Sequence, residues 1–312
     1  VSALVGTARL GQNTDMTDTP DILCIGSVLW DVIGRSASVM RQGSDVPGRI
    51  TRLPGGVAMN IAMAAARFGL TPALLTAIGR DAEGDELIAA CVSLGMLTGH
   101  IYRSDDLPTD VYMAVEGANG LIAAIADAHS LEEAGDKILR PLMDGTLGSA
   151  ASPYPGRIAL DGNLTRQLLE TIAVSPAFAA ADLRVAPASP GKAERLRPFL
   201  THTRAMLYVN IEEAGLLCHA EFTEAAEAAE AMIRKGAARV AVTDGGRSAA
   251  EAGPDGVIVG TPPEVLVTRV TGAGDTFMAA HIAAEAEGAD RTQALARALE
   301  SAARYVSGDT PL

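Results

Sequence analysis

Short apolar runs alternate with longer stretches of helical periodicity through the second half of the chain, and this alternation leaves few possible folds. Strand-like runs are found at residues 157–161, 183–186, 205–209 and 238–243. Helical stretches are found at residues 164–173, 192–200, 222–235 and 294–306. Such alternation indicates parallel strands joined by right-handed crossovers, with helices on both faces of one sheet. Ligands of such sheets bind beyond the carboxyl ends of the strands.

The first half of the chain begins with the same pattern. Apolar runs at residues 21–28 and 71–79 are candidate buried strands, and helices are expected at residues 55–67 and 81–94. We therefore expect an α/β protein with three layers, in which a mostly parallel central sheet is flanked by helices.

A second, smaller sheet is expected from segments that fit neither a core helix nor a core strand. Residues 35–54 are polar and contain several glycines and prolines, which predicts a surface flap. Two apolar runs, at residues 110–115 and 121–126, are joined by Glu-Gly-Ala-Asn-Gly and form the best hairpin signal in the chain. We expect a β-sheet lid built from about residues 35–54 and 98–128.

The composition fits one large domain that does not bind nucleic acid. The chain has 312 residues, of which 48% are hydrophobic and 20% charged, enough for one α/β domain with a small accessory part. We expect this domain over residues 21–312, with the aperiodic residues 1–20 as an extension. The net charge of −13 argues against a nucleic-acid partner, because a phosphate backbone requires a basic surface.

Other features favour a cytoplasmic protein without a membrane partner. No apolar run approaches the ~20 residues that span a bilayer. The N-terminus lacks the charged, apolar and small-residue order of a signal peptide. Cys24, Cys91 and Cys218 are scattered singly, which indicates a reducing compartment and argues against a disulfide framework or a zinc site.

A glycine-rich turn near the C-terminus runs directly into an apolar helix. It reads Thr271-Gly272-Ala273-Gly274-Asp275. Residues without bulky side chains let backbone N–H groups converge on one point, and the helix start adds partial positive charge there. Asp275, beside that point, could accept a proton from an attacking hydroxyl, so the turn suits phosphoryl transfer. The alternative is that Asp275 only caps the helix.

Two further features suit a hydroxylated ligand. Gly55 and Gly56 precede a helix and let a ligand approach the backbone closely, while Asn60, one turn later, offers both a donor and an acceptor. Asp31, just past the first strand, could accept hydrogen bonds from two vicinal hydroxyls of a sugar. The alternatives are an ordinary turn before a helix, a solvated asparagine and a loop aspartate.

Polar residues also follow two later strands. Asn210 and Glu213 face the same way if a helix starts there, and oxygen ligands of this kind suit Mg²⁺. The same spacing predicts a helix cap, and both functions can hold together. The turn at residues 243–246 offers a hydroxyl and freed backbone N–H groups to a phosphate, and the alternative is a simple turn into a strand at residues 248–251.

Together these motifs resemble the ribokinase-like (PfkB) family of sugar and nucleoside kinases, from about residue 21 to the C-terminus. The specific matches are Gly-Gly-x-x-x-Asn, followed at fixed spacing by Gly69 and Gly79, and Thr-Gly-Ala-Gly-Asp near the far end. The Asn-x-x-Glu between them strengthens the resemblance. It implies a ribokinase-like fold, ATP as the phosphate donor, Mg²⁺ as the metal, and a homodimer joined through the lid.

The resemblance also implies roles for individual residues. Asp275 matches the general base, and the anion hole for the transferring phosphate matches the amides of Gly272, Ala273 and Gly274. The positions that bind substrate hydroxyls match Asp31, Gly55, Gly56 and Asn60. The positions that bind the nucleotide match Asn210, Thr243, Gly245, Gly246, Thr271, Gly272 and Gly274. The pair that organises Mg²⁺ through water matches Asn210 and Glu213.

Within the family, the sequence is most similar to pseudouridine kinases, in residues 47–57, 160–164 and 185–192. This likeness adds Asp161 and Asn163 to the substrate site and implies transfer to the 5′-hydroxyl of a nucleoside. The chain departs from this subgroup at one position, because Ala186 stands where an aspartate is usual. Sugar kinases of the ribokinase, fructokinase or keto-deoxygluconate kinase type, other nucleoside kinases, and a non-catalytic sugar- or nucleoside-binding protein stay open.

Arg269 is a departure from the family as a whole. It lies six residues before Asp275, where the family often has an acidic residue or asparagine. In members activated by a monovalent cation, an acidic residue there helps to hold K⁺. A guanidinium cannot coordinate a cation and repels it, so a normal K⁺ site is doubtful. We hypothesise that Arg269 itself supplies that positive charge.

Overall fold

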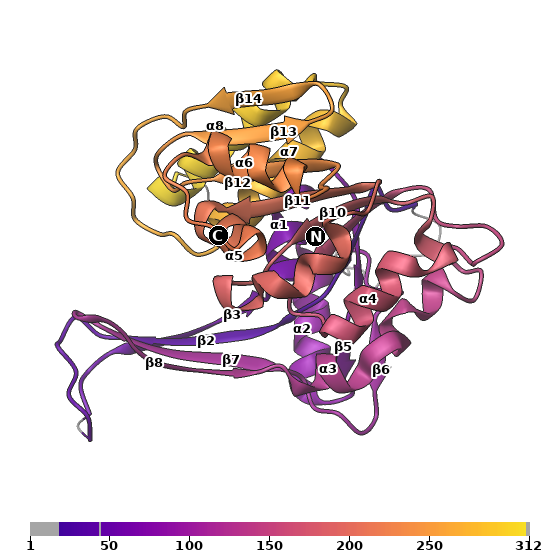
Figure 1. Cartoon of the computed structure of the whole chain (residues 1–312). Coiled ribbons are helices and arrows are strands. Elements are labelled where there is room, and N and C mark those ends of the chain that lie inside the picture. Colours follow the sequence, from indigo (N-terminus) through magenta and orange to yellow (C-terminus); the bar gives the residue numbers. More distant parts are fainter. Residues whose placement is uncertain (1–18, 44, 310–312) are drawn as a thin grey trace, which may run out of the picture.

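An eight-stranded sheet forms the centre of the structure, a computed structural model that describes residues 19–43 and 45–309 (Figure 1). The strand order is β14-β13-β12-β11-β10-β9-β1-β4. The strands from β12 to β4 pair in parallel, and β13 and β14 are antiparallel to their neighbours. The strands are β1 (Ile22–Ile25), β4 (Pro72–Leu75), β9 (Arg157–Asp161), β10 (Asp182–Ala186), β11 (Ala205–Asn210), β12 (Arg239–Thr243), β13 (Ala249–Gly253) and β14 (Gly256–Gly260). The predicted extension lies almost wholly outside the described residues.

Helices cover both faces of this sheet, so the predicted three-layer α/β fold is confirmed. One face carries α1 (Val57–Arg67), α2 (Ala82–Ser93), α7 (Ala273–Ala286) and α8 (Arg291–Ser307). The other face carries α3 (His129–Ala134), η1 (Gly135–Leu142), α4 (Arg166–Val174), η2 (Pro176–Phe178), η3 (Pro190–Phe199), α5 (Ile211–Cys218) and α6 (Ala225–Arg234). None of the helices in the described ranges is long and apolar enough to cross a membrane.

The sheet separates two hydrophobic cores. Successive side chains of a strand point to opposite faces, so each buried strand contributes to both cores. In β11, Leu207 and Val209 pack with the α4–α6 layer, while Met206 and Tyr208 pack with the α7–α8 layer. Burial on both faces explains why these strands read as continuous apolar runs in the sequence.

The predicted lid is a separate four-stranded sheet that extends away from the main body (Figure 1). Its strand order is β3-β2-β7-β8, with β2 parallel to β7 and the outer pairs antiparallel. The strands are β2 (Leu29–Arg35), β3 (Arg49–Gly55), β7 (Val111–Gly117) and β8 (Gly120–Asp127). Residues 98–110 do not join this sheet; they contain β6 (Tyr102–Ser104), which pairs with β5 (Ala77–Gly79) in a two-stranded sheet.

Two predicted elements differ from the structure. The expected strand at residues 71–79 is two strands, because the chain leaves the edge of the main sheet at Thr76 and then pairs with β6. The helical stretch expected at residues 192–200 is present as the 3₁₀ helix η3 and not as an α-helix. Pro198 lies inside η3 and has no N–H to donate to a carbonyl four residues earlier, which disfavours the α-helical pattern there.

Helices α1 and α7 lie against each other through small side chains. Ala62 and Ala65 of α1 and Ala279 and Ala280 of α7 all belong to one buried cluster. Helices with alanine at the contact approach more closely than helices with larger side chains. This packing brings the glycine-rich starts of both helices to the same edge of the sheet.

A buried polar network holds the other half of α7 to the strands. Arg184 of β10 donates to Glu285 of α7 at 2.5 Å and to Tyr208 of β11 at 3.0 Å. His281 of α7 lies between Tyr208 and Glu251 of β13, at 3.0 and 3.1 Å. Burial alone raises the pKa of Glu251, but hydrogen bonds from His281 and from an arginine outweigh it and lower that pKa to about 2. Every charge in this network therefore has a partner.

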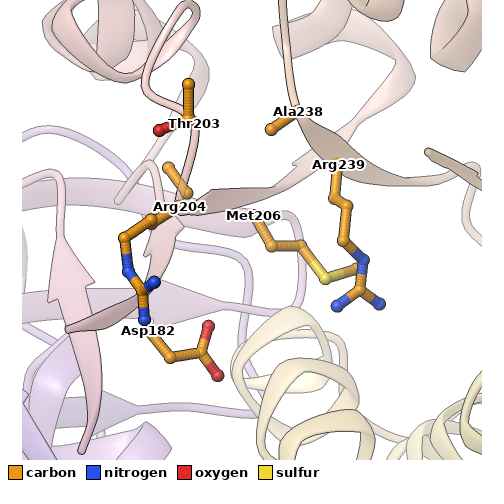
Figure 2. Close-up of a pocket in the computed structure, with 7 residues that line it drawn as sticks. Asp182, Thr203, Arg204, Met206, Ala238 and Arg239 are labelled. Atoms are coloured by element: carbon orange, nitrogen blue, oxygen red, sulfur yellow. The ribbon is translucent and has the colours of Figure 1, made fainter. Parts of the chain in front are cut away.

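A cavity of about 230 Å³ opens beside this network, at the amino ends of β10, β11 and β12 (Figure 2). Asp182, Arg204 and Arg239 line it. Arg239 is committed to Glu251 and Glu285, at 2.7 and 2.6 Å. Ligands of parallel sheets bind at the opposite, carboxyl ends of the strands, so this cavity is not the expected site.

Candidate active site

Three polar positions predicted from separate motifs meet at one edge of the main sheet. Asp161 ends β9, Asn210 ends β11 and Thr243 ends β12. The parallel pairing sets Asn210 directly opposite Thr243 and places the end of β1 beside the end of β9. Residues that are far apart in the sequence therefore surround one space because all their strands run in the same direction.

Ser27, which follows β1, connects the strand ends to helix α1. Its hydroxyl donates to Asp161 at 2.5 Å and accepts from Val57 N at 3.0 Å and from Asn163 Nδ2 at 2.9 Å. Its amide also donates to Asp161 at 2.8 Å. A Cβ on Gly56 would lie 2.4 Å from Ser27 O, so only glycine fits there, with its φ of 98°.

Asn60 of α1 joins this group to the C-terminal motif. Its side-chain amide donates to a carboxylate oxygen of Asp275 at 3.0 Å. The two residues belong to the two specific motifs of the sequence, and the packing of α1 on α7 brings them together. A predicted hydroxyl-binding residue and the predicted base are therefore in direct contact.

Asp31 lies on the lid sheet, next to the first glycine turn. A Cβ on Gly55 would lie 2.0 Å from Asp31 Oδ2, so this glycine leaves the room that the carboxyl occupies. Burial raises the pKa of Asp31 to about 6, and among the described residues nothing donates a hydrogen bond to it. Asp31, Gly55, Gly56, Asn60 and Asp275 therefore form a continuous series of neighbours from the lid to helix α7.

The start of α7 offers unpaired backbone donors. Gly272 adopts φ 86° and precedes the first helical residue, Ala273. The amide of Ala273 donates to Val270 O at 3.1 Å, whereas those of Gly272 and Gly274 have no partner among the described backbone carbonyls. The first N–H groups of a helix remain free for an anion. The anion hole predicted over three residues thus has two free amides in this structure.

Two carboxyls in the site have a pKa far above the ordinary value. Burial raises the pKa of Asp275 to about 7, the hydrogen bond from Asn60 lowers it, and the negative charges of Asp161 and Glu213 raise it again. Burial also raises the pKa of Glu213 to about 7, against the hydrogen bond from the Asn210 amide. Neither carboxyl forms an ion pair with a lysine or arginine in the described part of the chain.

The Asn210 and Glu213 pair forms the predicted helix cap at the start of α5. Asn210 Oδ1 accepts from Glu213 N at 2.9 Å, and Glu213 Oε2 accepts from Asn210 N at 2.8 Å. This reciprocal capping box uses one oxygen of each side chain, and the second oxygen of Glu213 has no partner among the residues that the structure describes. The cap therefore does not exclude a second role for this pair.

The turn after β12 contains an acidic residue that is paired with an arginine. Asp244 carries a negative charge into a loop predicted to bind phosphate, but Arg247 donates to it at 2.8 Å. Thr243 ends the strand, and Gly245 adopts φ 55° within the turn. Arg247 therefore offsets the acidic charge of a turn that has no lysine.

Asp161 and Asn163 occupy different depths in the site. Asp161 is fully buried, and its oxygens accept from Ser27 and from Asn163 N at 2.7 Å. Asn163 is half-buried and also accepts from Lys192 of η3. No sequence pattern singles out Ser27 or Lys192 as a site residue, because a lone serine or lysine in a turn has no spacing signal.

Comparisons with known proteins identify the family of this chain. The pfkB family carbohydrate kinase profile matches residues 19–308. Pseudouridine kinase of Escherichia coli (strain K12) is 26% identical over 280 residues, which cover 85% of this chain and 83% of that protein. Pseudouridine kinase of Arabidopsis thaliana is 32% identical over 100 residues, which are 32% of this chain and only 26% of the length of that relative.

Solved structures show the same fold. A carbohydrate kinase from Agrobacterium tumefaciens superposes with a TM-score of 0.76 at 24% identity, covering 91% of this chain and 90% of the other. Arabidopsis thaliana ribokinase complexed with ribose and ATP gives a TM-score of 0.72 at 19% identity, covering 93% of each. With the family match over nearly all the described residues, these findings show that the chain belongs to the pfkB family of carbohydrate kinases, phosphotransferases whose acceptor is an alcohol group.

Proposed function

We propose that this chain is an ATP-dependent kinase that transfers the γ-phosphate to the 5′-hydroxyl of a nucleoside, with pseudouridine as the first candidate. The observation that carries this proposal is the contact between Asn60 and Asp275, directly beside the free amides at the start of α7. In this contact Asn60, which can bind a hydroxyl, lies next to the proposed base Asp275 and next to the proposed phosphate-binding turn. Phosphoryl transfer depends on such positioning and on charge stabilisation.

Each part of the site has a defined role in this reaction. Asp31 and Asn60 bind sugar hydroxyls, and Asp275 accepts the proton of the attacking hydroxyl. A base acts best when its pKa lies near the working pH, and the raised pKa of Asp275, about 7, meets that condition. The amides of Gly272 and Gly274 stabilise the charge that develops on the transferred group. Asp161, with no exposed surface, acts by fixing Ser27 and Asn163.

Enzymes of this family use ATP and Mg²⁺, and the residues here fit a divalent cation. Glu213 and Asp275 are partly or wholly buried carboxyls without a cationic partner in residues 19–43 and 45–309, and each has a pKa raised to about 7. A bound divalent cation would offset both charges and the phosphate charge. Asn210 and Glu213 would hold it through water, since Mg²⁺ retains several of its waters. Thr243, Gly245, Gly246 and Thr271 are the proposed nucleotide contacts.

The nucleoside assignment rests on relatives and on one local feature. Pseudouridine kinases match this chain at 26% and 32% identity. The stretch that suggested this subgroup, around Asp161 and Asn163, lies within the site and not on a remote surface. Ala186 ends β10, pairs with Asp161 of the adjacent strand and is buried, so the position that departs from this subgroup lies next to Asp161.

The first prediction concerns the base. Asp275→Asn should lower kcat about 10²- to 10⁴-fold, because the variant cannot accept the hydroxyl proton. It should also raise the free energy of unfolding, because the carboxylate of Asp275 is destabilised by burial. This increase in the free energy of unfolding should be absent below pH 3.8, where Asp275 of the parent is protonated in both the folded and the unfolded state. It should be complete above about pH 7. ADP-release assays with the acceptor and urea unfolding at several pH values measure the two effects.

Asp255→Asn is the matched control, because Asp255 is exposed in the turn between β13 and β14. It should leave kcat unchanged and should alter the free energy of unfolding by no more than about 0.5 kcal/mol. Turnover of Asp275→Asn close to that of the parent would exclude Asp275 as the base.

The second prediction concerns the acceptor and the monovalent cation. We expect ADP release from Mg²⁺ and ATP with pseudouridine, and far less with uridine, cytidine, adenosine, ribose, fructose or 2-keto-3-deoxygluconate. Replacing potassium with choline at equal ionic strength should leave the rate unchanged, because Arg269 carries a fixed positive charge. Turnover with a different acceptor would keep the kinase assignment and replace pseudouridine with that acceptor as the substrate. Ligand binding without ADP release would favour a binding protein.

We also propose a homodimer formed through the lid. Ile50, Met113 and Ile125 lie on one face of this sheet by strand register, opposite to the face of Asp31, and are 79%, 48% and 65% exposed. Three large apolar side chains gathered on one sheet face are typical of an interaction surface. Pairing of two lids would cover them and would leave Asp31 facing the ligand.

The third prediction tests this assembly. Ile125→Asp should convert a dimer to a monomer in sedimentation velocity, because it sets a charge in the centre of the covered face. Val174→Asp is the control, because Val174 is 82% exposed on α4, away from the lid. A monomeric parent protein at micromolar concentration would overturn the proposal.

A further inference from the structure

The segment that leads into the phosphate-binding turn is tied to the end of helix α8. Residues 261–272 have no regular secondary structure, yet their last part is held by backbone hydrogen bonds. Thr268 N and Arg269 N both donate to Val306 O, at 2.8 and 3.2 Å. Thr268 Oγ1 donates to the same carbonyl at 3.1 Å. The last carbonyls of a helix lack partners within the helix, so α8 offers fixed acceptors to this segment.

Side chains add a second connection at the same place. Arg269 Nε donates to Tyr305 O at 2.7 Å, and its guanidinium lies 3.9 Å from the centre of the Tyr305 ring. The Tyr305 hydroxyl donates to Thr271 O at 2.9 Å. A Cβ on Gly272 would lie 2.5 Å from that hydroxyl, so the phenol fits closely against the turn. Arg269 thus holds Tyr305, and Tyr305 holds the backbone that presents the free amides.

Electrostatic attraction stabilises this contact between Arg269 and the end of α8. The C-terminal end of α8 carries partial negative charge, which the guanidinium of Arg269 offsets. The stacked arrangement adds an attraction between the cation and the aromatic ring. Burial raises the pKa of Tyr305, Arg269 lowers it and Asp275 raises it, so the phenol is near enough to the proposed base to sense its charge.

We propose that Arg269 and Tyr305 are positioning residues that fix the phosphate-binding amides of Gly272 and Gly274 before any ligand arrives. Neither residue touches the reacting atoms. The expected effect on turnover rests on the proposed kinase function. Whether Arg269 and Tyr305 hold the turn in place can be measured without any activity. An anion hole acts well only when its donors need no rearrangement during the reaction.

The first arm of the test measures the tie directly. Hydrogen exchange of the full chain, followed by mass spectrometry, should show faster exchange at residues 268–276 in Arg269→Ala than in the parent. Exchange outside this segment and the last turn of α8 should be unchanged. Arg304→Ala is the matched control, because Arg304 lies on the last turns of α8 but is exposed and paired with Glu300. Equal exchange in all three proteins would overturn the inference, whatever the enzyme phosphorylates.

The second arm measures the consequence for transfer. Arg269→Ala should lower kcat roughly 100-fold, the size of effect expected from a displacement of about 1 Å at a reacting group. The KM for the acceptor should not change, since Arg269 is not among the residues that hold it. Added guanidinium chloride at millimolar concentration should restore part of kcat in this variant and none in Asp275→Asn. Tyr305→Phe keeps the ring but loses the bond to Thr271, so it should give an intermediate loss.

Two results would contradict the inference while leaving the kinase proposal intact. One is a kcat for Arg269→Ala equal to that of Arg304→Ala. The other is a loss seen only in the acceptor KM, which would make Arg269 a binding residue. If no acceptor is turned over, the kinase proposal fails. The hydrogen-exchange experiment alone then decides whether Arg269 and Tyr305 fix the turn.

Discussion

Uncompensated buried carboxyls determine the character of this molecule's candidate site. At the amino ends of the strands, the acids Glu251 and Glu285 are paired with arginines, and Glu251 has a pKa lowered to about 2. At the carboxyl ends, Glu213 and Asp275 have no cationic partner among the described residues, and burial raises the pKa of each to about 7. A fold can carry such unpaired acids only where the rest of the structure is stable enough to hold them.

The arrangement of α7 connects these two environments. Its C-terminal half is fixed to four neighbouring strands through His281 and Glu285. Its N-terminal end presents Asp275 and the free amides. The packing of α7 on α1 then sets Asn60 against Asp275 at 3.0 Å. A helix held firmly at one end can present a strained and electrostatically unfavourable group at the other, which is a common cost of catalytic sites.

The sequence predicted the parts of the site that depend on local pattern. Gly56 and Gly272 were recognised because small residues before a helix are visible in the sequence, and Asn210 and Glu213 because a capping box has a fixed spacing. The parallel sheet followed from the alternation of strands and helices. From these features the meeting of the motifs at one edge could be expected, because parallel strands end together.

Other features could not be predicted because they depend on tertiary contacts. Ser27 is an ordinary turn residue until β9 brings Asp161 against it. Tyr305 lies within a regular amphipathic helix, and only the return of the chain before α7 places it against Thr271. The division of residues 71–79 into two strands is set by which neighbour each half pairs with. Contacts of this kind leave no periodic signal in the sequence.

The central claim is that Asp275 works as a base whose pKa has been raised by its surroundings. The most direct test is the pH dependence of kcat/KM for the best acceptor, which reports the pKa values of essential groups in the free enzyme. We expect the rate to rise with pH through about 7, as the carboxyl of Asp275 loses its proton, and to level off above it. A flat profile between about pH 5 and 9 would contradict the account, because no group in the site would then need to be deprotonated for transfer.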